Sequence, residues 1–64
     1  MKKVNIQSDK IVVLGNLAFM LEDVRGIRGG HDDDEVFVIT EYGEYLAIGI
    51  NFNNAIFTWA TGGN

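Results

Sequence analysis

The chain has 64 residues, a formal net charge of −4 and 47% hydrophobic residues, which is the composition of one folded domain. The absence of cysteine excludes disulfides and thiolate metal sites, and the single histidine, His31, excludes the usual multi-histidine zinc site within one chain. A domain of this size buries only about 60% of the surface that its unfolded chain exposes. Oligomerisation or a tight partner is therefore the expected means of further stabilisation.

The start of the chain has none of the features of a signal peptide. After Met1, Lys2 and Lys3, residues 4–9 contain no continuous apolar stretch. No run in the sequence approaches the roughly 18 apolar residues of a membrane span. We expect a cytoplasmic protein that does not enter a membrane, and the lack of cysteine agrees with an intracellular location.

Charge is unevenly distributed along the chain. Residues 1–21 carry three lysines and one aspartate, for a net charge of +2. Residues 22–44 carry eight carboxylates and two arginines, for a net charge of −6. Residues 45–64 carry no charged side chain, which predicts that this last third is buried against something.

Short strands are expected along much of the chain. Lys2–Gln7 alternates apolar and polar residues, which predicts a half-buried strand. Lys10–Leu14 contains a β-branched run that is typical of a strand apolar on both faces. Val24–Arg28 and Val36–Thr40 are the next predicted strands, with a polar loop between them.

The residues after Leu14 have two interpretations. Gly15 followed by Asn16 suits a two-residue type II′ hairpin turn that leads into a strand over Leu17–Leu21. Alternatively, Asn16 caps a helix, because apolar residues follow at helical spacing, at positions 17, 20, 21 and 24. Two acids near the carboxyl end of that helix would be unfavourable, so we favour the extended path with at most one helical turn.

A hairpin is expected to join Val36–Thr40 to Tyr45–Ile50. A two-residue turn through Tyr42 and Gly43 would place Glu41 opposite Glu44, and like charges in that position are unfavourable. We therefore predict a three-residue turn over residues 41–43 with Gly43 in a left-handed conformation. In this register Val36, Val38 and Thr40 face Ile48, Leu46 and Glu44, while Phe37 and Ile39 face Ala47 and Tyr45. Both faces of the hairpin are then apolar.

The end of the chain completes the expected fold. Asn51–Asn54 predicts a turn, Ala55–Ala60 a last strand, and residues 61–64 a frayed tail. The predicted fold class for the single domain 1–64 is all-β, a small antiparallel sheet or open barrel of about five strands. The alternative is an α+β fold with one short helix near residues 17–25.

No group of residues predicts catalysis or metal binding. The run from His31 to Glu35 supplies oxygen ligands but lacks EF-hand spacing, so a solvated loop is expected. The remaining carboxylates lie in turns and loops, where solvent keeps them from forming an acid–base pair. We expect a protein without enzymatic activity, cofactor or metal.

Acidic residues form the first candidate binding surface. Eight carboxylates within residues 22–44 could imitate a phosphate backbone and dock on a basic protein that handles nucleic acids. Tyr42, an aromatic side chain within an acidic rim, is a candidate anchor. The candidate partner-binding residues are Asp32, Asp33, Asp34, Glu35, Glu41, Tyr42 and Glu44. The same charge disfavours direct binding of nucleic acid. The alternative is that these acids serve only to keep the protein soluble.

The apolar surplus predicts contact between copies of the chain. A small sheet that is apolar on both faces either closes into a small barrel or buries its second face against another chain, and we expect the second arrangement. The candidate oligomer-interface residues are Tyr45, Phe52, Phe57 and Trp59.

These expectations favour a small acidic binding protein that docks on a macromolecular partner and modulates or inhibits it. Its size and composition fit a phage or mobile-element antagonist of a host protein. The main alternative is a homo-oligomeric ring or cage that binds a small ligand or RNA between subunits. An enzyme whose site forms at a subunit interface is the third hypothesis.

Overall fold

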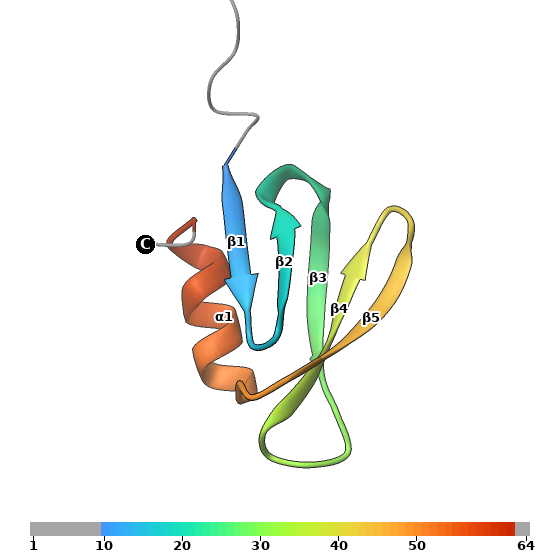
Figure 1. The fold of residues 1–64 in the computed structure, drawn as a ribbon, viewed down its shortest axis with the longest axis vertical. Coiled ribbons are helices and arrows are strands. Elements are labelled where there is room, and N and C mark those ends of the chain that lie inside the picture. The colour runs from blue at the N-terminus through green and yellow to red at the C-terminus, as the bar shows by residue number, and fades with distance from the viewer. Residues whose placement is uncertain (1–9, 63–64) are drawn as a thin grey trace, which may run out of the picture.

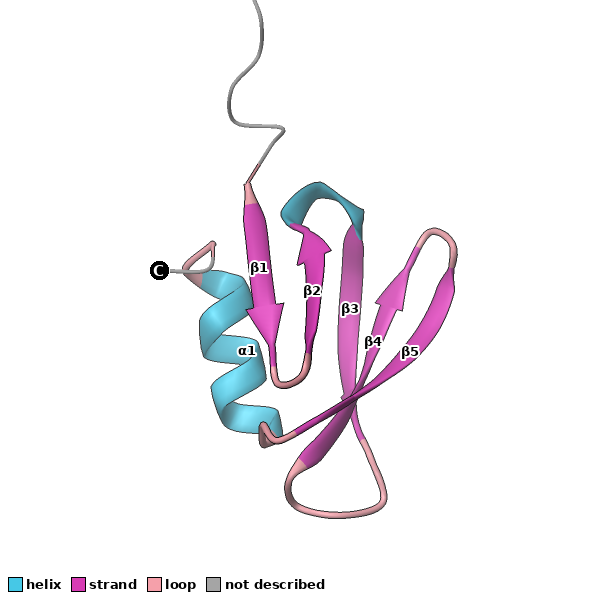
Figure 2. Cartoon of the chain, viewed as in Figure 1, coloured by secondary structure: helices cyan, strands magenta, loops and turns pink. Residues whose placement is uncertain are grey.

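The computed structural model describes residues 10–62, which form two antiparallel β-sheets and one α-helix (Figures 1 and 2). The elements in chain order are β1 (Ile11–Leu14), β2 (Leu17–Met20), a 3-10 turn η2 (Leu21–Asp23), β3 (Val24–Gly29), β4 (Glu35–Thr40), β5 (Gly43–Ile48) and α1 (Phe52–Ala60). β1 pairs with β2, and β4 lies between β3 and β5 in the second sheet. The prediction of a small β-rich fold is confirmed. The predicted strand Lys2–Gln7 lies outside the described residues.

The first hairpin turns through Gly15 and Asn16, with Leu14 paired to Leu17. Gly15 has φ +62°, and no residue other than glycine has a positive φ in the described chain, which fits the predicted type II′ turn. The alternative α+β class is consistent with the single helix α1, but the position given for that helix, near residues 17–25, is wrong. Residues 17–20 pair with β1 along one edge, and within residues 17–25 only Leu21–Asp23 forms a helical turn, η2.

The core lies between the inner faces of the two sheets and α1. β1 contributes Val12 and Leu14, which are fully buried, while Ile11 and Val13 on its opposite face are 51% and 59% exposed. The strand therefore buries one face only, although its sequence is apolar on both. The complete set of buried apolar residues is Val12, Leu14, Val24, Val36, Val38, Ala47 and Ala55.

The predicted register of the β4–β5 hairpin is wrong by one residue. The structure pairs Thr40 with Gly43 and Val38 with Tyr45, so the turn contains only Glu41 and Tyr42. The Thr40 hydroxyl accepts a hydrogen bond from the Tyr42 N–H and donates one to the Gly43 carbonyl, both at 3.0 Å. This side chain closes the turn without the expected bulge, although Gly43 does have a positive φ of 134°.

The register change reverses the faces of β5. Because side chains alternate along a strand, a shift of one residue moves every side chain to the opposite face. Ala47 and Tyr45 now share the inner face with Val36 and Val38. Leu46 and Ile48, predicted opposite those buried valines, lie on the outer face.

The predicted last strand over Ala55–Ala60 is wrong, because this segment belongs to α1. Asn51, expected within a turn, is the N-cap, and its side chain accepts a hydrogen bond from the Asn54 N–H at 2.8 Å. Ala55 is fully buried and has a small side chain, which lets the helix approach the sheet closely. Thr61 and Gly62, expected to begin a frayed tail, donate backbone hydrogen bonds to helix carbonyls and end the helix.

Candidate functional site

The candidate partner-binding residues lie at the two ends of β4. Asp32, Asp33 and Asp34 are exposed in the loop between β3 and β4, here called the aspartate loop (residues 30–34). Glu41 and Tyr42 form the turn between β4 and β5, and Glu44 lies at the start of β5; residues 41–44 are here called the tyrosine turn. Since a strand rises about 3.3 Å per residue, six-residue β4 separates these regions by roughly 20 Å. The structure thus presents two acidic regions instead of one.

The aspartate loop is held by its own backbone and by Glu35. The Glu35 carboxylate accepts hydrogen bonds from the backbone N–H groups of His31, at 2.9 Å, and Asp32, at 3.4 Å. The Asp34 carbonyl accepts two more, from Gly49 at 2.7 Å and Ile50 at 3.2 Å. Glu35 therefore positions the loop, and the three aspartate side chains remain exposed around it.

A groove of about 470 Å³ lies beside the aspartate loop. It separates the loop from the first turn of α1, and Asp32, Asp33 and Phe52 are among the residues that line it. The described residues contain no group of three or more histidine, cysteine or carboxylate side chains placed to hold a metal ion. The groove thus combines acidic and aromatic side chains, a combination suited to a basic or amphipathic group on a partner.

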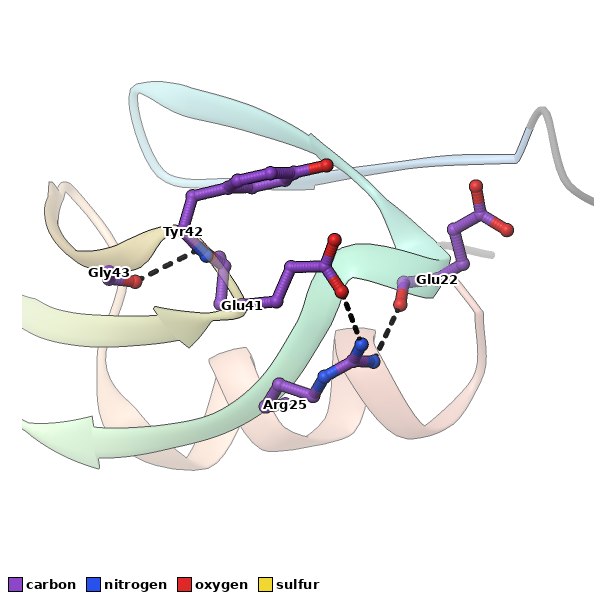
Figure 3. A network of polar contacts seen from close by, with 6 residues as sticks. Glu22, Arg25, Glu41, Tyr42 and Gly43 are labelled. Atoms are coloured by element: carbon purple, nitrogen blue, oxygen red, sulfur yellow. Dashed lines mark hydrogen bonds and ion pairs between the residues drawn. The ribbon is translucent and has the colours of Figure 1, made fainter.

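The tyrosine turn is tied to β3 by Arg25. Its guanidinium donates to the Glu41 carboxylate at 2.6 Å and to the Glu22 carbonyl at 2.9 Å. Figure 3 shows the Glu41 carboxylate between Arg25 and the Tyr42 ring. Tyr42 is 70% exposed. Hydrogen bonding to Glu41 raises the pKa of Tyr42, and the charges of Glu41, Asp23 and Glu22 add to this effect. The exposed phenol therefore stands in a negative electrostatic environment.

A second groove, of about 410 Å³, lies between β2 and the tyrosine turn. Its lining is mostly apolar and includes Leu17, Phe19, Met20 and Tyr45. The rings of Phe19 and Tyr45 are in tilted contact, with centroids 5.8 Å apart. Tyr45, a candidate oligomer-interface residue, therefore packs partly within its own chain.

The other three candidate oligomer-interface residues lie on α1. Trp59 is half-buried and packs against the core, whereas Phe52 and Phe57 are 42% and 64% exposed. None of these three helix residues is among those that line the groove beside Tyr45.

The outer face of the β3–β4–β5 sheet is an apolar surface to which the sequence interpretation assigned the wrong residues of β5. We define it by Phe37 and Ile39 of β4 and Leu46 and Ile48 of β5. Phe37 and Ile39 are half-buried, while Leu46 and Ile48 are 43% and 47% exposed. The wrong β4–β5 register placed Ala47 and Tyr45 beside Phe37 and Ile39, where the structure has Leu46 and Ile48.

One ion pair crosses this outer face. Arg28, on β3, binds the Glu44 carboxylate of β5 through two nitrogen atoms, at 2.9 and 3.1 Å. Its guanidinium also lies over the Phe37 ring, 4.3 Å from the ring centroid. About half of each charged side chain remains accessible to solvent.

No protein-family model, curated protein or solved structure matches this chain. No helix within residues 10–62 is long and apolar enough to cross a membrane.

Proposed function

We propose that this protein is a non-enzymatic, cytoplasmic binding protein that docks on a macromolecular partner and modulates or inhibits it. The observation that supports this proposal best is the aspartate loop. Three consecutive carboxylates are exposed there, on a backbone fixed by hydrogen bonds from Gly49 and Ile50. A fixed cluster of like charges loses little conformational freedom when it binds, so it is suited to recognition of a basic surface.

The charges around the loop support a basic partner. Arg25 and Arg28 form ion pairs with Glu41 and Glu44 at the other end of β4. Among the described residues, no ion pair involves the three aspartates of the loop. Their uncompensated charge can steer a positively charged protein surface into contact. A protein that binds nucleic acid has such a surface, which fits a phage or mobile-element antagonist that imitates phosphate groups.

The test begins with capture of the partner from the native host and its purification. The variant Asp32→Asn/Asp33→Asn/Asp34→Asn removes three charges while keeping side-chain size. The association rate constant should fall at least about tenfold at low salt, and its dependence on ionic strength should weaken. The matched control, Asp9→Asn/Glu22→Gln/Asp23→Asn, removes three charges that lie outside the candidate partner-binding residues. Equal binding by the aspartate variant and the unmodified chain would disprove docking through the loop.

A second candidate function is a homo-oligomer that binds a small ligand or RNA between subunits. Large apolar side chains are exposed on three surfaces: the outer face of β1, the outer face of the second sheet, and α1. Exposed apolar side chains in such numbers favour an interaction with another molecule. Light scattering after size-exclusion chromatography tests this candidate, and a monomer at all concentrations would exclude it.

A further inference from the structure

The groove between β2 and the tyrosine turn, here called the aromatic groove, is bordered by three aromatic side chains. Phe19 comes from β2, Tyr42 from the tyrosine turn and Tyr45 from β5. The rings of Phe19 and Tyr45 are inclined to each other by 54°, so they form a corner instead of a stack. Tyr42 adds a third ring, which the rest of the described chain leaves 70% exposed.

The aromatic groove lies where β2 and β5 separate. The backbone of Asn16, just before β2, is bonded to Ile48 at the end of β5. Beyond this point the two strands belong to different sheets, and the rings of Phe19 and Tyr45 lie in contact between them. The gap is therefore held by backbone and ring contacts before any ligand arrives, which lowers the entropic cost of binding.

The aromatic groove carries negative charge without a base beside it. Asp23, at the end of η2, lines the groove, and its carboxylate forms no ion pair within the described chain. No lysine or arginine of the described chain is among the lining residues. Arg25 is already held by the Glu41 carboxylate and the Glu22 carbonyl. Together with Glu41, the Asp23 charge raises the pKa of Tyr42, so a negative potential reaches the phenol.

We propose that the aromatic groove binds the side chain of a trimethylated lysine on a partner protein. A cation is attracted to an aromatic ring when it lies within about 6 Å of the ring centroid. Because the Phe19 and Tyr45 centroids are 5.8 Å apart, one ammonium group can satisfy this condition for both rings. Asp23 supplies the opposite charge. Leu17 and Met20, which also line the groove, offer apolar surface to the aliphatic stem of the lysine.

The polar groups of the aromatic groove favour a methylated over an unmodified lysine. An unmodified ammonium group has three N–H donors that need acceptors when water is removed. The Thr40 hydroxyl already accepts from the Tyr42 N–H and donates to the Gly43 carbonyl. Among the lining side chains, Asp23 is the only carboxylate. A trimethylated ammonium keeps the charge but has no N–H, so aromatic rings and one carboxylate suffice to hold it.

The same lining favours a protein side chain over a choline headgroup of a lipid. In a phosphocholine group a phosphate lies close to the quaternary ammonium. The aromatic groove offers that phosphate no lysine or arginine of the described chain, and the Asp23 carboxylate would repel it. The stem of a lysine is uncharged and apolar instead. The groove volume of about 410 Å³ is within the range of sites that hold small ligands.

Heteronuclear NMR titration with short glycine peptides tests the proposal. The probes carry a central trimethyllysine, an unmodified lysine, or the neutral analogue in which a carbon atom replaces the ammonium nitrogen. The trimethyllysine peptide should bind at least about fivefold more tightly than the other two and should shift the amide signals of Phe19, Tyr42 and Tyr45. Equal affinity for the neutral analogue would overturn the proposal, because the groove would then recognise apolar bulk alone. Absence of binding at millimolar peptide would also overturn it.

Matched variants at Tyr42 separate the ring from its hydroxyl. Tyr42→Leu keeps an apolar side chain but removes the ring, and it should weaken binding of the trimethyllysine peptide at least about threefold. Tyr42→Phe keeps the ring and should bind the peptide nearly as well as the unmodified chain. Phe57→Leu is the control, since Phe57 is an exposed aromatic residue of α1 outside the groove. Equal affinities for Tyr42→Leu and Tyr42→Phe would contradict recognition by the ring.

Two variants with the same change of charge test the carboxylate. Asp23→Asn removes the charge within the aromatic groove, whereas Asp34→Asn removes one in the aspartate loop. Only Asp23→Asn should weaken binding of the trimethyllysine peptide, and circular dichroism confirms that both variants are folded. Equal affinities of the two variants would rule out the role of Asp23.

Phosphatidylcholine vesicles provide the competing source of a quaternary ammonium group. The protein should remain in the supernatant when such vesicles are sedimented. Sedimentation with the vesicles that Tyr42→Leu abolishes would overturn the assignment to a protein side chain and would indicate a lipid headgroup instead.

This proposal does not depend on docking through the aspartate loop. The variant that neutralises the three loop aspartates should bind the trimethyllysine peptide as the unmodified chain does. The control variant for loop docking, Asp9→Asn/Glu22→Gln/Asp23→Asn, lacks the groove carboxylate and should bind the peptide more weakly. Since the two variants are expected to act in different assays, the two proposals can fail separately.

Discussion

Asn16 and Ile48 form a reciprocal pair of hydrogen bonds across 32 positions of sequence. The Asn16 N–H donates to the Ile48 carbonyl at 3.0 Å, and the Asn16 side-chain oxygen accepts from the Ile48 N–H at 2.9 Å. This pair fastens the turn of the first hairpin to the end of β5. It joins the two sheets at the end of β5, an edge strand. Without it, the N–H and carbonyl groups of Ile48 would lose these partners.

Replacement of Asn16 by alanine should destabilise the protein by about 1 kcal/mol. The change removes the acceptor for the Ile48 N–H, although solvent can partly replace it at this exposed position. Urea denaturation followed by circular dichroism measures the effect. Asn53→Ala, at an exposed helix position, is the control and should change the free energy of unfolding much less.

Replacement of Gly15 by alanine should cost more, at least about 2 kcal/mol. A Cβ atom at this position would overlap the Ile48 carbonyl oxygen, and the φ of +62° is unfavourable for alanine. Gly29→Ala is the matched control, because no atom lies within 4 Å of its added Cβ. Equal free energies of unfolding for the two variants would contradict the close approach of the first turn to β5.

Loss of the helix cap should weaken α1. Asn51→Ala removes the acceptor for the Asn54 N–H and should lower stability by about 1 kcal/mol. Amide hydrogen exchange should also accelerate in the first turn of the helix. Asn54→Ala serves as the comparison, since Asn54 contributes its backbone N–H to the cap and alanine keeps that group. If both variants behave alike, the capping role of Asn51 is wrong.

The tyrosine turn should depend on the Thr40 hydroxyl. Thr40→Val keeps the shape of the side chain but removes both the acceptor for the Tyr42 N–H and the donor to the Gly43 carbonyl. Because Thr40 is buried, we expect a loss of about 1 to 2 kcal/mol in the free energy of unfolding. Thr58→Val, in the helix, is the comparison. A native-like exchange rate for the Tyr42 amide in Thr40→Val would argue against this closure of the turn.

The ionisation of Tyr42 offers a test at high pH. Its pKa is raised above 10.0, so the folded protein keeps the phenol protonated while the unfolded chain has begun to lose the proton. Stability linked to this group is therefore complete below pH 10 and declines as the pH rises from 10 through the raised pKa. Ultraviolet absorbance of the phenolate follows the titration, and Tyr42→Phe identifies its transition. Glu41→Gln should return the pKa towards its usual value; an unchanged midpoint would disprove the influence of Glu41.

Local signals predicted the parts of the fold that depend on a few neighbouring residues. The two-residue turn at Gly15 and Asn16 follows from the conformational freedom of glycine, and the apolar runs predicted β1, β3 and β4. The acidic loop between Gly29 and Glu35 was also predicted where it lies. The hydrogen bond by which the Glu35 carboxylate holds that loop was not predicted. It forms only when the folded loop brings the His31 N–H close to Glu35.

The last segment illustrates a pattern with two interpretations. Phe57 and Trp59 alternate as they would in a strand, yet Phe52, Ala55, Ile56 and Trp59 also recur at helical spacing. Asn51 just before them was the signal that could have identified the helix. Packing of the fully buried Ala55 against the sheet favours the helix, and that contact is not visible in the local sequence.

The sequence by itself determined that this chain is small and β-rich, with an acidic middle and an uncharged last third. Only the tertiary structure decided how that last third is used: its first part supplies β5, and its second part forms α1. It also decided which face of β5 is open, because a shift of one residue in register exchanges the two faces. Turn propensities act over a few residues, whereas the register and the helix depend on contacts such as Thr40 with Gly43 and Asn16 with Ile48, which exist only once the chain has folded.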